Sequence, residues 1–149
     1  MSESAEVVLA YWREHRDQMR QSESQRAVLT NYVLIIVAAL SGFIVQQQFR
    51  VAALPLSVLI AVIGVFGAIT VAKYHERAVY HLSQARVLTR ALVEAGDLPD
   101  HEAELGEARA AHYRGYPRLN RLHLHRLWTG LHLGIALYGT TLTIVVAVR

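Results

Sequence analysis

The chain of 149 residues contains no cysteine, and its charged residues are scarce and unevenly placed. The lack of cysteine excludes a disulfide framework, a thiol nucleophile and a thiolate metal site. Charged residues make up 18% of the sequence, against ~25% in an average soluble domain. Asp, Glu, Lys and Arg are missing altogether from three runs that cover 67 positions, which are residues 27–49, 51–72 and 127–148. This pattern excludes a soluble globular enzyme.

The three charge-free runs predict an all-α integral membrane protein. Each run has 22 or 23 residues, and a helix needs ~20 mainly apolar residues to cross ~30 Å of hydrocarbon. Backbone groups in lipid must bond internally, and three strands cannot close a barrel, so the spans are helices. We expect transmembrane helices at about 28–47, 54–73 and 127–148. The first is preceded by five acidic residues, which is unlike a signal peptide.

The spans divide one membrane domain, residues 1–149, into four segments. We expect an N-terminal cytoplasmic helix at 1–27, a transmembrane hairpin at 28–73, a cytoplasmic helical segment at 74–126 and a third transmembrane segment at 127–149. The short link between the first two spans makes them antiparallel neighbours. Of the 15 Lys and Arg residues, 13 then lie on the side of the N-terminus and 73–126, and only Arg50 and Arg149 lie on the other. This excess predicts a cytoplasmic N-terminus and an outside C-terminus.

The cytoplasmic segments carry helical patterns of their own. Residues 4–26 predict a charged helix, and Ser22 with Gln25 has the spacing of a capping box. The first span therefore either begins afresh there or continues this helix. After the second span nothing breaks the helix until Gly96, and a short helix follows at about 101–113. An apolar seam predicts packing on the N-terminal helix or on a neighbouring subunit, and its members are Ala78, Leu82, Ala85, Leu88 and Leu92.

Small residues recur at helical spacing in all three spans. Such faces let helices approach closely, which matters because lipid gives no hydrophobic drive for association. They serve packing within one chain or between chains, and their number favours a homo-oligomer. The members are Ala38 and Gly42 in the first span, Ser57, Ala61, Gly64 and Ala68 in the second, and Gly130 and Gly134 in the third.

A second, weakly polar stripe follows the third span. It contains Thr129, His132, Thr140 and Thr143, of which His132 is the only ionisable side chain in any of the charge-free runs apart from tyrosine. Ionisable groups in a membrane face a bundle interior or water. The stripe therefore either lines a pore or packs, with threonines bonded back to their own helix.

The sequence offers no enzymatic or metal-binding motif of high specificity. None of the eight histidines has H-E-x-x-H spacing, and there is no P-loop, G-x-S-x-G or G-x-G-x-x-G. We therefore expect no catalytic residue, no metal, no cofactor and no nucleic-acid partner. One remote alternative is Arg118 and His123, which fit the loose Arg-x4-His spacing of HEPN ribonucleases, where Arg orients phosphate and His moves the proton of the 2′-OH.

The order of segments resembles the SLATT group of small bacterial membrane proteins. The resemblance covers about residues 5–95: a polar helix with Trp12 and Arg13, a tight two-span hairpin, and the continuous helix from Lys73 to Leu82. The third span lies outside this two-span pattern. The resemblance implies an inner-membrane effector of nucleotide-signalling or other anti-phage defence, which forms pores or disrupts the membrane of an infected cell.

Together these patterns favour a homo-oligomeric, non-enzymatic effector of the bacterial inner membrane. Its partners would be the lipid bilayer, further copies of itself, and a cytoplasmic protein or nucleotide signal received by the cytoplasmic helices. The alternative is a passive membrane anchor that recruits a soluble partner through residues 74–125. An RNA-cleaving membrane protein is the remote third hypothesis.

Overall fold

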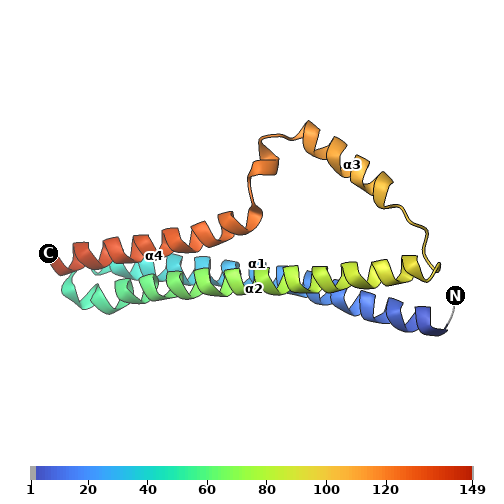
Figure 1. Ribbon diagram of the computed structural model, residues 1–149. Coiled ribbons are helices and arrows are strands. Elements are labelled where there is room, and N and C mark those ends of the chain that lie inside the picture. Colours follow the sequence, from blue (N-terminus) through green and yellow to red (C-terminus); the bar gives the residue numbers. More distant parts are fainter. Residues whose placement is uncertain (1–2, 149) are drawn as a thin grey trace. The chain divides into compact units, whose positions relative to one another are not determined.

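The computed structural model describes residues 3–148, and within them every regular element is helical (Figure 1). The long helices are α1 (Glu3–Gln46), α2 (Leu54–Glu94) and α4 (Leu124–Val148), with the shorter α3 (Glu102–Gly115) between the last two. Two 3₁₀ turns, η1 (Val51–Ala53) and η2 (Leu119–Arg121), connect them. All three long helices contain a stretch long and apolar enough to cross a membrane. Arg149, the predicted outside charge, lies beyond the described residues.

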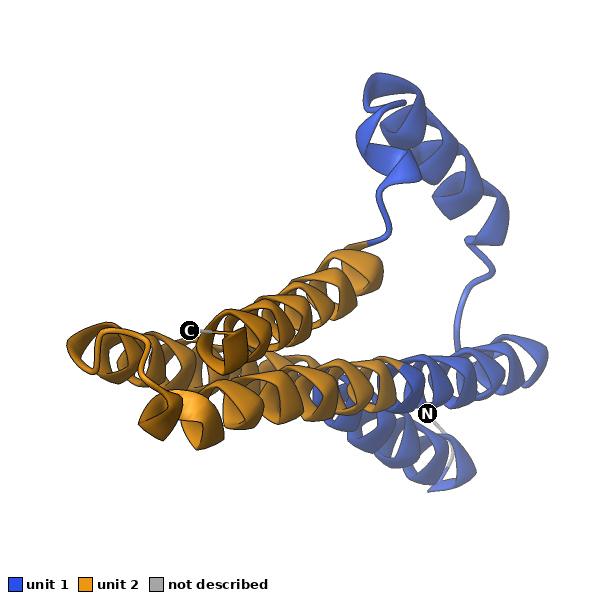
Figure 2. Cartoon of the chain, turned by 90° about the vertical axis from the view of Figure 1, so that its left-hand side faces the viewer, with its two compact units in different colours: residues 1–22, 76–123 blue, residues 23–75, 124–149 orange. Residues whose placement is uncertain are grey.

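The contacts divide the chain into two compact units, coloured separately in Figure 2. Unit 1 comprises Met1–Ser22 and Glu76–His123, and unit 2 comprises Glu23–His75 and Leu124–Arg149. The unit boundaries fall within a few residues of the predicted membrane boundaries. All three charge-free runs lie in unit 2, whereas 21 of the 27 Asp, Glu, Lys and Arg residues lie in unit 1.

Two helices run through both units without a break. The structure decides between the two alternatives for residues 4–47, because α1 continues from Glu3 to Gln46. Ser22 is buried, and its hydroxyl donates to the Gln18 carbonyl four residues back at 2.9 Å, so it does not cap a new helix. Helix α2 likewise continues past the second charge-free run to Glu94, as predicted.

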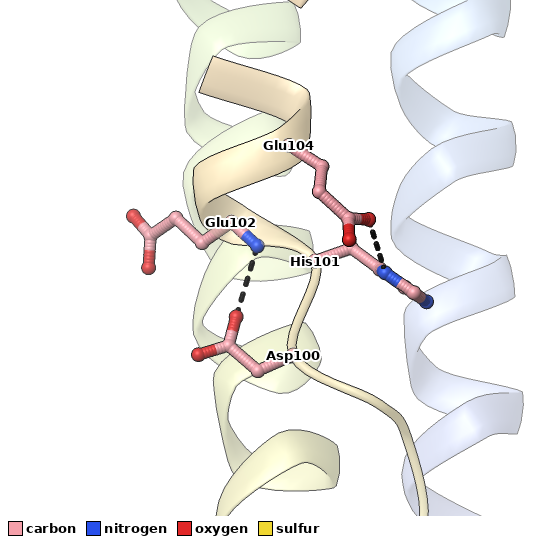
Figure 3. Close-up of polar contacts among 4 residues, drawn as sticks. All are labelled: Asp100, His101, Glu102 and Glu104. Atoms are coloured by element: carbon pink, nitrogen blue, oxygen red, sulfur yellow. Dashed lines mark hydrogen bonds and ion pairs between the residues drawn. The ribbon is translucent and has the colours of Figure 1, made fainter. Parts of the chain in front are cut away.

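The helix ends follow from local backbone chemistry. Gln48 and Phe49 have φ values of 54° and 56° at the hairpin tip, where the Phe49 N–H bonds back to the Ile44 carbonyl at 3.2 Å. Gly96 has φ 76° just beyond α2, a left-handed conformation that glycine adopts without steric cost. Asp100 Oδ1 accepts the Glu102 N–H at 2.9 Å at the start of α3. His101 Nδ1 lies 2.7 Å from Glu104 Oε2 in the same turn (Figure 3).

In unit 2, α1, α2 and α4 enclose a narrow apolar core. The fully buried side chains include Ile44, Ile60 and Val146, with Val33 and Ile135 nearly so. The outer faces of the same helices are also apolar, with exposed side chains such as Ile35, Phe66 and Leu137. A bundle that is apolar inside and outside is typical of a protein surrounded by lipid.

Unit 1 contains a pair of helical segments, residues 3–22 of α1 and 76–94 of α2. The predicted seam is buried or half-buried in this pair, and Ala5 of α1 is buried with it. Trp12 Nε1 donates to Thr89 Oγ1 at 2.9 Å, and Arg77 donates to Gln18 Oε1 at 3.1 Å. The seam therefore packs within the chain against the N-terminal segment, one of its two predicted partners.

Candidate functional site

A close helix contact in unit 2 joins α2 to α4 through small residues. A Cβ atom added to Gly64 would lie 2.3 Å from the backbone N of Ala136, and one added to Gly139 would lie 2.3 Å from the backbone N of Ala61. Neither position can accept a methyl group unless the helices move apart. The Ser57–Ala68 face is thus used inside the chain, where Ser57, Gly64 and Ala68 are buried and Ala61 half-buried. Gly139 belongs to this contact although it is not part of the small-residue pattern of Gly130 and Gly134 in the sequence.

His132 is fully buried in the same interface. A Cβ on Gly67 would lie 2.1 Å from His132 Nδ1, so the glycine makes room for the ring. On the other side, Nε2 lies 3.1 Å from Thr30 Oγ1, whose own proton is directed at the Arg26 carbonyl at 3.0 Å. The Thr30 oxygen is left to accept from Nε2, which assigns the ring proton to Nε2. Nδ1 is then an enclosed acceptor without a partner.

The other predicted pore-lining residues bond back to their own helix. The hydroxyls of Thr129, Thr140 and Thr143 donate to the carbonyls four residues earlier at 2.8–3.0 Å. Thr143 also lies 3.1 Å from Ser57 Oγ, and Thr140 is exposed. In the single chain this geometry favours the packing interpretation of the stripe. Pore lining stays a prediction for an assembled form.

Two of the predicted small-residue faces have no partner within the described chain. Ala38 and Gly42 on α1, and Gly130 and Gly134 on α4, are all exposed. A Cβ on any of the three glycines would meet no atom within 4 Å. These faces differ in this respect from the Ser57–Ala68 face, and they remain open to another helix.

A layer of nitrogen-bearing side chains lies at one end of unit 2, near the predicted start of the first span. The Arg26 guanidinium carbon lies 5.4 Å from the Trp128 ring centroid, and the rings of His75 and His125 stack at 4.1 Å. Arg26 Nε and Trp128 Nε1 are enclosed without hydrogen-bond partners. Burial lowers the pKa of His75 below its usual 6.5, and the neighbouring charges of His125 and Arg26 lower it further. We call Arg26, His75, His125 and Trp128 the boundary layer.

A second histidine pair lies in unit 1. His15 Nδ1 and His81 Nδ1 are 3.0 Å apart, a distance that requires one ring to donate and the other to accept. Burial lowers the pKa of His81, and His15 and Arg77 lower it further. A neutral pair is therefore compatible with the helix contact, whereas two charged rings would repel.

The remaining candidates show no assembled chemistry. Arg118 and His123 are both exposed, and His123 Nδ1 lies 3.1 Å from the Arg121 carbonyl. The ribonuclease hypothesis stays a prediction. It would be wrong if RNA remained intact after incubation with the purified protein. Within residues 3–148 no three side chains of the metal-binding types come together.

Comparison of the chain with protein-family models, with curated proteins and with solved structures gives no match.

Proposed function

We propose that this chain is a homo-oligomeric protein of the bacterial inner membrane that opens a pore or disrupts the bilayer. The N-terminus and residues 74–126 face the cytoplasm, and the C-terminus lies outside. The helix pair of unit 1 receives a trigger from a protein or small molecule, in keeping with the anti-phage role that the resemblance implies. Three apolar helices and a distribution of 13 to 2 basic residues support the membrane placement.

One observation carries the proposal of self-assembly. The chain uses one of its small-residue faces internally and leaves those around Gly42 and Gly134 open, with an apolar surface around them. Helices in lipid associate through such faces because only there can their backbones approach closely. A second copy of the same chain offers matching faces, and a ring of copies would enclose a lumen.

The direct test is expression in bacteria together with a dye that reports membrane potential. We expect depolarisation on induction, and we expect Gly42→Leu and Gly134→Leu to weaken it, because a bulky side chain blocks close approach. Gly106→Leu is the matched control, since Gly106 is exposed in α3 with nothing within 4 Å of an added Cβ. Potential unchanged at high expression, with or without the neighbouring genes, would count heavily against the proposal.

A second candidate function is a passive anchor that recruits a soluble partner through residues 74–125. It is favoured by α3, in which no residue is buried, and by the enclosure of His132 within one chain. Capture of one partner at equal stoichiometry, together with no conductance in liposomes, would support the anchor over the effector.

A further inference from the structure

Arg26 is a buried cation without an ion-pair partner among residues 3–148. Its side chain is only 6% exposed, and no carboxylate among residues 3–148 forms an ion pair with it. Glu23, one turn earlier on α1, is exposed and forms no such pair. A buried charge is costly unless an opposite charge compensates it. The cation–π contact with Trp128 compensates only part of that cost.

The groups around Arg26 are, like its guanidinium, suited to contact an anion. Trp128 Nε1 is a hydrogen-bond donor with no partner, and the guanidinium Nε is another. His75 approaches from α2 and is stacked on His125 of α4. The boundary layer thus brings one fixed cation, two imidazoles and an indole N–H together from all three helices. Among the described residues whose charges act on His75, Glu23 alone favours its protonation.

We propose that the boundary layer binds a single phosphate-type anion, with Arg26 as its principal ligand. The planar guanidinium presents paired donors that match two phosphate oxygens, which a point charge such as Lys does not. A phospholipid headgroup and a soluble nucleotide or inorganic phosphate carry the same chemistry. Binding of a lipid headgroup rests on the proposed membrane placement, because Arg26 lies at the predicted start of the first span. Binding of a soluble phosphate does not depend on that placement.

Anion binding has a consequence for His75. In the free protein the charge of Arg26 contributes to keeping the pKa of His75 low. A bound anion offsets that charge and favours the protonated imidazole. Affinity for an anion of constant charge should therefore increase as the pH falls from 8 to 5.5, and this increase should disappear in His75→Phe.

The chain has only two tryptophans, so a Trp12→Phe background leaves Trp128 as the sole indole emitter, within the site. The protein in phosphatidylcholine nanodiscs is titrated with phosphatidylglycerol in one arm, and with inorganic phosphate or ATP in the other. We expect a saturable change in Trp128 emission in at least one arm. Arg26→Gln should raise the half-saturating concentration at least about tenfold, the effect of losing a charge-assisted contact.

Arg20→Gln is the matched control, because Arg20 is an exposed arginine on the same helix, paired with Asp17 at 2.7 Å. It should leave the half-saturating concentration within about twofold. A response to lipid alone identifies a headgroup site, and a response to soluble phosphate identifies a soluble ligand. No saturable response in either arm, or equal effects of Arg26→Gln and Arg20→Gln, would overturn the proposal.

Stability provides an independent check on the role of Arg26. If Arg26 is an uncompensated cation, Arg26→Met should not lower the SDS concentration that unfolds the protein in neutral nanodiscs. The same variant should lose the stabilisation that the anion gives to the unmodified protein. Destabilisation of equal size with and without the anion would assign Arg26 a purely structural role and overturn the proposal. Binding can succeed in nanodiscs even if the depolarisation test fails, so the two failures are distinguishable.

Discussion

The contact between α2 and α4 predicts that one methyl group will have opposite effects at two glycines of the same helix. Gly139→Ala places a Cβ 2.3 Å from the backbone N of Ala61. Backbone cannot rotate away as a side chain can, so the helices must separate, and overpacking of this kind costs ~1–3 kcal/mol. Gly134→Ala meets nothing within 4 Å and gains up to ~1 kcal/mol of helix propensity.

Both substitutions replace glycine by alanine inside α4, so the gain in helix propensity is common to both, and the two variants should differ by roughly 1–3 kcal/mol in free energy of unfolding. The assay is SDS-driven unfolding of the monomeric protein in mixed micelles, followed by circular dichroism, so that effects on assembly do not enter. Gly67→Ala should also destabilise, because its Cβ would collide with the buried His132 ring. Equal stability of Gly139→Ala and Gly134→Ala would refute the close α2–α4 approach.

Three further predictions concern the hairpin tip, unit 1 and topology. Gln48→Gly should stabilise the protein by ~1 kcal/mol in the same SDS assay, because Gln48 has φ 54° and glycine adopts that conformation without steric cost. Burial and His15 lower the pKa of His81 in the folded chain, so the unfolded chain binds the proton more tightly, and the stability of unit 1 should fall as the pH drops below 6.5. This is measured as a red shift of Trp12 emission at low pH in a Trp128→Phe protein. The shift should be absent when His81→Phe is added. Finally, in this cysteine-free chain an impermeant thiol reagent on intact cells should label a cysteine at Gln48 and spare one at Gly96; the reverse would invert the topology.

The helices and their ends could be predicted from the sequence because they depend on local properties. The charge-free runs predict the three apolar segments. Gly96 predicts the end of α2, where it adopts a left-handed backbone conformation. The continuity of α1 could not be predicted, since Ser22 fits both a cap and a helix interior. Its burial and its bond to Gln18 decide between them.

The tertiary contacts could not be predicted because they depend on how each helix is rotated about its axis. The spacing of Gly130 and Gly134 predicts a packing face that is open in the structure, whereas Gly139 makes the contact between α4 and α2. In the sequence, Arg26 is only one of several basic residues expected on the cytoplasmic side. Its burial against Trp128 follows from the packing of α1 on α4, which no local pattern indicates.

Liposomes show whether copies of this chain assemble and breach a bilayer. Purified protein is reconstituted at increasing protein-to-lipid ratios, and release of an encapsulated dye is measured. We expect dye release to rise more steeply than in proportion to protein density. Gly134→Leu should suppress this release, whereas Gly106→Leu should not. Dye retained at every density by inserted, folded protein would contradict this expectation.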